Sequence, residues 1–168
     1  MGSFRPFVLN VTNKKGLQMK LYTFAATVCI ALSLSTAAVA GGCDASDELQ
    51  ALALNIYHEA RGESEKGMRM VGEVTINRVS SSIYPDTICD VVYQDCQFSW
   101  TCSKKSKRPR EEEAWEKSLE IAKELLDENV ASYPHLATHF VNLRVARPSW
   151  TRKFDKVKKI GDHTFYRM

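Results

Sequence analysis

The spacing of apolar and polar residues predicts three long helices. Apolar side chains recur every three or four positions, which places them on one helix face. This spacing is found in residues 47–61, 65–80 and 111–129. Asp44 or Ser46 can cap the first helix and Ser64 the second, with Gly62 as a stop between them. The last helix has the clearest apolar stripe, formed by Trp115, Leu119, Ala122 and Leu126.

The rest of the chain predicts shorter elements. The dipeptide Pro85–Asp86 breaks the chain and can start a short helix that runs through Val91 to Tyr93. Residues 94–110 have no helical period, which indicates a long loop or a short hairpin. Two β-rich runs near the end, residues 138–142 and 163–166, predict strands that form a small C-terminal β-hairpin or sheet. We therefore expect an α+β domain that is mainly helical.

Glu59 is the most informative residue, because it shares a helix face with apolar side chains. It lies seven residues after Leu52 and three after Ile56. Desolvation raises the pKa of a carboxyl group, which keeps it protonated near neutrality and suits it to general acid catalysis. The alternative is a carboxylate at the rim of the apolar stripe that pairs with Arg61 or Arg69 and has no catalytic role.

The first forty residues read as a leader rather than as part of the domain. Residues 19–40 have a basic start at Lys20, an apolar or small-residue stretch, and a small-residue cleavage site at 38–40. This predicts a signal peptide and export to the periplasm, the cell envelope or the medium. An uncleaved leader would instead anchor the chain in the membrane. Residues 41–168 form one domain in either case, and we expect a monomer.

Net charge gives no support to a nucleic-acid role. The chain has 23 Lys and Arg against 20 Asp and Glu, but four of the basic residues and none of the acidic ones lie in the leader. The domain itself is close to neutral. The basic run 104–110 can be read as a nucleic-acid signal, but in an exported protein it favours a solvated loop or a contact with an anionic wall polymer.

The cysteines of the domain predict disulfides. Their even number in a small exported domain favours two bridges, with three pairings open. A zinc site is less favoured, because no C-x-x-C pair is present. The four candidates are Cys43, Cys89, Cys96 and Cys102.

Other catalytic classes find little support, which leaves carboxylate chemistry. The zinc-protease helix motif needs a second histidine four residues after His58, and that position is Gly62. No Gly-x-Ser-x-Gly elbow is present. We expect neither a metal nor a cofactor. Glycoside cleavage commonly uses two carboxyl groups, and Glu63 or Glu73 is the candidate partner of Glu59. With no second carboxylate in reach, Glu59 alone can act as acid and then as base.

Aromatic and amide side chains outside the long helices suit a sugar-binding cleft, because rings stack on sugars and amides bind their hydroxyls. The ordinary alternative is a place in the core, which we favour for Phe140 and Phe165. The candidate substrate-binding residues are Gln97, Ser99, Trp100, Trp150, His163 and Tyr166.

Five blocks of the sequence, in order, resemble the SleB-type cell wall hydrolases, the catalytic domain of spore cortex-lytic enzymes. The blocks are IYHEARGE at 56–63, VTINRV at 74–79, YPDTIC at 84–89, CQFSW at 96–100 and IGDHTFY at 160–166. The resemblance covers nearly all of residues 41–168 and implies a lysozyme-like fold that acts on the glycan strands of peptidoglycan.

The resemblance also implies a mechanism. Glu59 would be the catalytic acid of a lytic transglycosylase, which cleaves between N-acetylmuramic acid (MurNAc) and N-acetylglucosamine and leaves a 1,6-anhydro sugar. The alternatives are a muramidase that uses water, an N-acetylmuramoyl-L-alanine amidase, and a wall-binding module without activity. A nucleic-acid partner is not expected. Whether the chain remodels a bacterium's own wall or serves a phage stays open.

Overall fold

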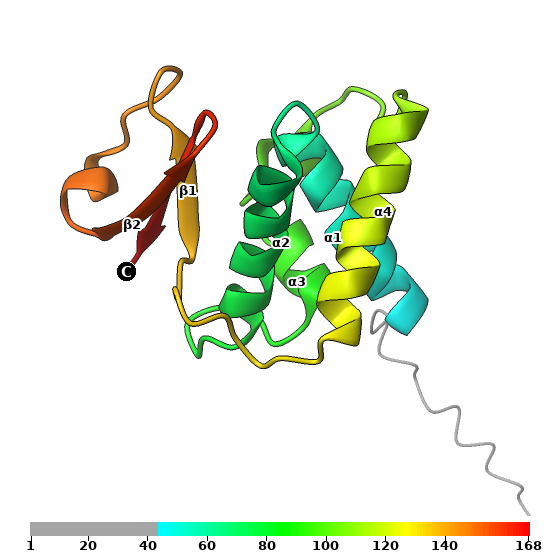
Figure 1. The fold of residues 1–168 in the computed structure, drawn as a ribbon, viewed down its shortest axis with the longest axis horizontal. Coiled ribbons are helices and arrows are strands. Elements are labelled where there is room, and N and C mark those ends of the chain that lie inside the picture. Colours follow the sequence, from blue (N-terminus) through cyan, green and yellow to red (C-terminus); the bar gives the residue numbers. More distant parts are fainter. Residues whose placement is uncertain (1–43) are drawn as a thin grey trace, which may run out of the picture. The chain divides into compact units, whose positions relative to one another are not determined.

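The computed structural model describes residues 44–168, so the predicted leader and Cys43 lie outside the described part. Within that part, no helix combines the length and the apolar character needed to cross a membrane. The elements are α1 (Ala45–Ala60), α2 (Glu65–Val79), α3 (Ile88–Tyr93), the 3₁₀ helix η1 (Ser99–Cys102), α4 (Glu112–Asp127), β1 (His139–Asn142), the 3₁₀ helix η2 (Ser149–Arg152), β2 (Asp155–Ile160) and β3 (His163–Arg167) (Figure 1). The predicted α+β organisation is confirmed.

Side-chain caps fix where three of the helices begin. Asp44 caps α1 and forms a reciprocal capping box with Asp47. Ser64 caps α2, as predicted. The start predicted for α3 at Pro85–Asp86 was too early, because the side chain of Thr87 caps the helix and Ile88 is its first residue.

The four α-helices enclose the main apolar core. α1 packs against α2, α3 and α4, and these helices lie side by side in Figure 1. Gly72 allows α2 to approach its neighbours closely, since a Cβ at this position would clash with Leu125 of α4 and lie 3.0 Å from Ile56 Cδ1 of α1. The most buried positions of α4 are Ser118, Ile121, Ala122 and Leu125. The predicted stripe was therefore off-centre, because Trp115, Leu119 and Leu126 are only partly buried at its edges.

The three strands form an antiparallel sheet with the order β1-β3-β2. The sequence prediction missed β2, whose residues DKVKKI are largely exposed and carry three lysines. Lysine is common on edge strands, where it discourages pairing with other chains. β3 is the central strand and contributes Phe165 to the core.

Two sets of polar contacts join the sheet to the helices. At the end of α2, Asn77 donates to the carbonyl of Ala137 at 3.0 Å, and Arg78 Nε donates to the carbonyl of Thr138 at 2.7 Å. At the other end of the sheet, the carboxylate of Glu63 accepts the backbone N–H of Asp162 at 3.2 and 3.3 Å. The residue before Asp162 is Gly161, with φ of +55°, and a Cβ there would collide with the Glu63 carboxylate.

Residues 94–110 form a loop that contains η1, and no hairpin is present there. Cys96 and Cys102 are joined by a disulfide that closes the segment around η1. This is one of the pairings predicted from the sequence. The pairing of Cys43 stays a prediction, and Cys89 is buried in α3.

Gly72→Val tests the close contact between α2 and its neighbours. We expect it to lower the free energy of unfolding by about 1–3 kcal/mol, the usual cost of overpacking a well-packed core. The matched control is Gly62→Val, because an added Cβ at Gly62 meets nothing within 4 Å. Urea denaturation of the two variants checks this, and equal stability would contradict the packing argument.

Candidate functional site

Glu59 lies in the last turn of α1 and is half-buried. Burial raises the pKa of its carboxyl group to about 6, while the positive charge of Arg78 acts in the opposite direction. The effect of burial is the larger of the two. The raised pKa predicted from the apolar face of the helix is therefore present in the structure, and the group can exist in both protonation states near neutral pH.

Arg78 is the charged group that acts on Glu59, and it is itself buried. Its guanidinium lies over the rings of Tyr84 at 5.3 Å and Phe98 at 5.1 Å, in addition to its hydrogen bond to Thr138. Burial lowers the pKa of Arg78, opposed by the nearby Tyr84 and Glu59. Its Nη1 atom is buried without a hydrogen-bond partner in the structure. This side chain links Glu59 to the segment that leads into the sheet.

Aromatic rings and histidines continue the site from Arg78 into the sheet. Phe98 stacks on Phe140 with 6.4 Å between ring centroids. The His139 ring is 6.5 Å from that of Tyr84, and burial together with the charge of Arg78 lowers the pKa of His139 to about 4. His139 is therefore neutral at pH 7. The aromatic rings of Tyr84 and Phe98 and the neutral imidazole of His139 thus lie around Arg78, whose charge acts on Glu59.

Glu63 and Glu73, the two candidate partners of Glu59, each have other contacts. Glu63 accepts the N–H of Asp162 and lies 3.8 Å from His163 Nδ1. Burial lowers the pKa of His163, and the charge of Glu63 opposes this effect. Glu73 pairs with Arg69 at 3.2 Å and with His135 at 3.0 Å. Both carboxylates therefore hold other parts of the fold together.

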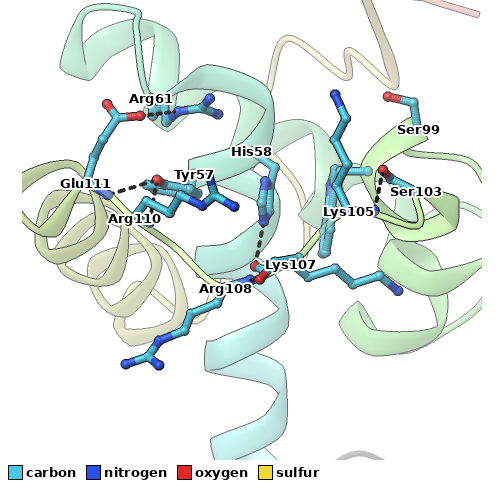
Figure 2. Close-up of a pocket in the computed structure, with 12 residues that line it drawn as sticks. Tyr57, His58, Arg61, Ser99, Ser103, Lys105, Lys107, Arg108, Arg110 and Glu111 are labelled. Carbon is cyan, nitrogen blue, oxygen red and sulfur yellow. Dashed lines mark hydrogen bonds and ion pairs between the residues drawn. The ribbon is translucent and has the colours of Figure 1, made fainter.

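A cavity of about 510 Å³ opens on the side of α1 where His58 lies. Figure 2 shows Tyr57 and His58 of α1, together with Arg61 just after it, on one wall, while η1 and the loop that follows it contribute the other. The His58 ring stacks on the Trp100 ring with 4.5 Å between centroids. Five of the lining residues are basic: Arg61, Lys105, Lys107, Arg108 and Arg110.

Two of the six predicted substrate-binding residues, Ser99 and Trp100, line this cavity. Most of the Trp100 ring is buried, and its Nε1 donates to Asn55 Oδ1 at 3.2 Å. Gln97 is exposed in the disulfide-closed segment beside them. The Asn55 side chain also donates to Thr75 Oγ1 of α2, so η1 is fixed to both α1 and α2.

The other three predicted substrate-binding residues belong to the sheet and its 3₁₀ helix. Trp150 packs edge-on against Tyr166 at 5.3 Å and also contacts His139 at 5.1 Å. Tyr166 is buried in β3. His163 packs against Phe140 at 5.2 Å. The predicted set is therefore divided between the cavity wall and the sheet.

Sequence reasoning missed Arg78 and the pair Tyr57 and His58. Tyr57 falls at the same helical spacing as the apolar residues of α1, yet its hydroxyl accepts the backbone N–H groups of Arg110 and Glu111 at 3.0 and 3.2 Å. Arg78 follows Val71 and Val74 at helical spacing. An arginine on an apolar face was the available signal, because a buried cation needs partners.

A comparison with protein-family models identifies the family. The model described as Cell Wall Hydrolase matches residues 62–166. The chain belongs to the cell wall hydrolase family. The SleB-type resemblance seen in the sequence is thereby confirmed. The matched range includes Arg78 and begins three residues after Glu59.

Solved structures agree with this assignment. The catalytic domain of the germination-specific lytic transglycosylase SleB from Bacillus anthracis is 27% identical, with a TM-score of 0.57, and the match covers 71% of this chain and 93% of that one. The catalytic domain of the Bacillus cereus SleB protein is 26% identical, with a TM-score of 0.58 and coverage of 76% and 94%. The fold class predicted from the resemblance is therefore confirmed.

The match spans only part of the length of the curated relatives. The spore cortex-lytic enzyme of Oceanobacillus iheyensis is 26% identical over 121 residues, which are 71% of this chain and 41% of the relative. That of Bacillus subtilis is 25% identical over 120 residues, or 71% and 37%. The matched part is thus about two fifths of the length of these relatives.

Clusters that suit a metal ion are not found in residues 44–168, since no three His, Cys, Asp or Glu side chains gather there in a suitable way.

Arg61 pairs with Glu111 at 2.8 Å and not with Glu59. Arg69 pairs with Glu73 at 3.2 Å and also with Glu124 and Glu128. The alternative in which Arg61 or Arg69 neutralises Glu59 is therefore wrong.

The raised pKa of Glu59 predicts a pH-dependent effect of Glu59→Gln on stability. A carboxyl group with a folded-state pKa above its unfolded value destabilises the fold when it ionises, so the cost is absent below about pH 4.5 and complete above about pH 6. We expect the variant to gain up to about 2 kcal/mol relative to the parent between pH 4 and pH 7.5. Urea denaturation at the two pH values measures this, and a difference that does not change with pH would refute the assigned pKa.

Proposed function

We propose that this cell wall hydrolase cleaves the bond between MurNAc and N-acetylglucosamine in peptidoglycan, as a lytic transglycosylase with Glu59 as its acid and base. The observation that carries the proposal is a half-buried glutamic acid with a pKa of about 6 beside a buried arginine. Strong pKa perturbation of this kind is concentrated at catalytic sites. The similarity to a lytic transglycosylase from Bacillus anthracis supports the same reaction class.

The hydrogen bond and the burial of Glu63 favour a mechanism that uses only one catalytic carboxylate. A hydrolase with two acids needs its second carboxylate free to activate water or to attack the sugar. Glu63 instead accepts the N–H of Asp162, and its side chain is only 13% exposed. Glu73 is held by Arg69 and His135. A transglycosylase has no need of a second carboxylate, because the substrate supplies the nucleophile.

The two steps of the reaction together return Glu59 to its protonated starting state. The protonated acid gives its proton to the glycosidic oxygen as the bond from C1 of MurNAc to that oxygen breaks. The resulting carboxylate takes the proton of the C6 hydroxyl, whose oxygen bonds to C1 and closes the 1,6-anhydro ring. No water is consumed. Arg78 stabilises the carboxylate that exists between the two steps, because an opposite charge favours the ionised form.

The remaining expectations of the sequence fit an extracytoplasmic enzyme. We propose that residues 1–40 direct export, with a signal peptide at 19–40, and that residues 41–168 act on the wall as a monomer. The Cys96–Cys102 disulfide agrees with an oxidising compartment. The wall polymer is then the only partner that the reaction requires.

The reaction products test the proposal. We expect the mature chain to release 1,6-anhydromuropeptides from purified peptidoglycan, and Glu59→Gln to lose at least about 100-fold in rate, the usual contribution of a general acid. Mass spectrometry of the soluble products measures both. Ordinary reducing ends would instead identify a muramidase, intact glycans an amidase, and binding without any products a wall-binding module.

Glu63→Gln is the matched control for Glu59→Gln. A glutamine at position 63 keeps an oxygen that can accept the N–H of Asp162, so a structural role predicts nearly full activity. A loss as large as that of Glu59→Gln, with the fold intact by circular dichroism, would make Glu63 the second catalytic carboxylate.

The pH dependence of the rate follows from the pKa of Glu59. Because the acid must be protonated when substrate binds, we expect kcat/KM to fall above about pH 6, by about tenfold per pH unit. Initial rates on solubilised glycan strands between pH 4.5 and pH 8.5 measure this. A rate that is constant from pH 5 to pH 8 would exclude Glu59 as the acid.

A further inference from the structure

The cavity beside His58 has a strongly one-sided charge. Only Glu111 among its lining residues is acidic, and Glu111 is paired with Arg61 at 2.8 Å. Within residues 44–168, the side chains of Lys105, Lys107 and Arg108 have no ion pair. Figure 2 shows these three side chains at the rim of the cavity, extending from the loop in different directions. A cavity of this kind attracts anions.

The basic loop is held against α1 by specific contacts. The backbone carbonyl of Lys107 lies 2.9 Å from His58 Nε2, and the Tyr57 hydroxyl accepts two backbone N–H groups at the end of the loop. Ser103 and Ser106 accept the N–H groups of Lys105 and Arg108 at 3.2 and 3.3 Å. These bonds, several of which are visible in Figure 2, fix the backbone that carries the basic side chains.

The cavity is adjacent to the surroundings of Glu59 along two segments of the chain. His58 and Glu59 are consecutive in α1. In the segment around η1, Phe98 contacts Arg78 and Trp100 contacts His58, with Ser99 exposed between them. Residues that line the cavity are therefore direct chain neighbours of Glu59 and of Phe98, which contacts Arg78.

We propose that the cavity binds the acidic peptide stems of peptidoglycan, so that the enzyme selects glycan strands that still carry peptides. This inference rests on the proposed function. The stems branch from the lactyl group of MurNAc, the sugar whose C1 reacts, and they carry free carboxylates. A volume of about 510 Å³ suits a few residues of an extended peptide. The hydroxyl of Ser99 can supply a polar contact to the bound peptide stem, and the stacked rings of Trp100 and His58 can supply apolar ones.

The test compares two triple variants on two substrates. The first variant combines Lys105→Gln, Lys107→Gln and Arg108→Gln in the cavity rim. The control combines Lys156→Gln, Lys158→Gln and Lys159→Gln, which removes the same charge from the exposed strand β2. The substrates are glycan strands with their peptides and the same strands after an amidase has removed them.

We expect the rim variant to raise KM on peptide-bearing strands at least about tenfold, with kcat changed less than about twofold, because three charge-assisted contacts are lost from binding only. On denuded strands the rim variant should equal the parent. The control should equal the parent on both substrates. The parent should itself show a lower KM on peptide-bearing strands.

Two results would overturn the proposal. One is an equal loss on both substrates; the other is an equal loss in the β2 control, which would indicate general attraction to an anionic polymer.

Binding of the free acidic tetrapeptide, measured by calorimetry in 50 mM and 200 mM salt, separates this proposal from the proposed function. If no glycan is cleaved by any variant, binding by the parent and loss in the rim variant still support the site, and absence of binding by the parent refutes it. Stronger competition by a phosphate-rich wall polymer than by the tetrapeptide would also refute it.

Discussion

The attachment of the sheet to the helices and the pKa of Glu59 both depend on the buried side chain of Arg78. An unpaired cation in a protein interior is very costly, and removal of one partner of a buried charge leaves that cost uncompensated. Here a carbonyl, two aromatic rings and the charge of Glu59 compensate it together, and they come from four different segments. The residue thus fixes the positions of Tyr84, Phe98 and Thr138 relative to the end of α1.

Glu59 and Glu63 are only four residues apart, but their carboxyl groups have different surroundings and therefore different roles. The side chain of Glu63 is 13% exposed, accepts the backbone N–H of Asp162 and lies 3.8 Å from His163 Nδ1. Burial of Glu59 is offset only partly by Arg78, and its pKa rises. Residue type alone does not distinguish them. The distinction arises because α1 ends between the two, so that the turn at Gly62 directs Glu63 toward the sheet.

Local patterns predicted the helices and the raised pKa of Glu59, because helical spacing and caps act over a few residues. The strand β2 was missed since its lysines face solvent and its pairing depends on backbone bonds to β3, which leave no apolar alternation in the sequence. The role of Arg78 depends on Thr138, sixty positions away, and no local pattern reports such a contact. The cavity beside His58 was likewise not predictable, because the carbonyl of Lys107 and the hydroxyl of Tyr57 bring a distant loop onto α1.

The bond between Glu63 and Asp162 also has a consequence for how the chain folds. It spans 99 positions, so it closes one of the longest loops available in the described chain. Loop closure costs entropy that only later contacts recover, which delays such pairings relative to the local contacts of the helices. The helical layer can therefore assemble first, while the strands complete the structure last. A chain released from synthesis before Gly161 would lack this link and would have no finished site.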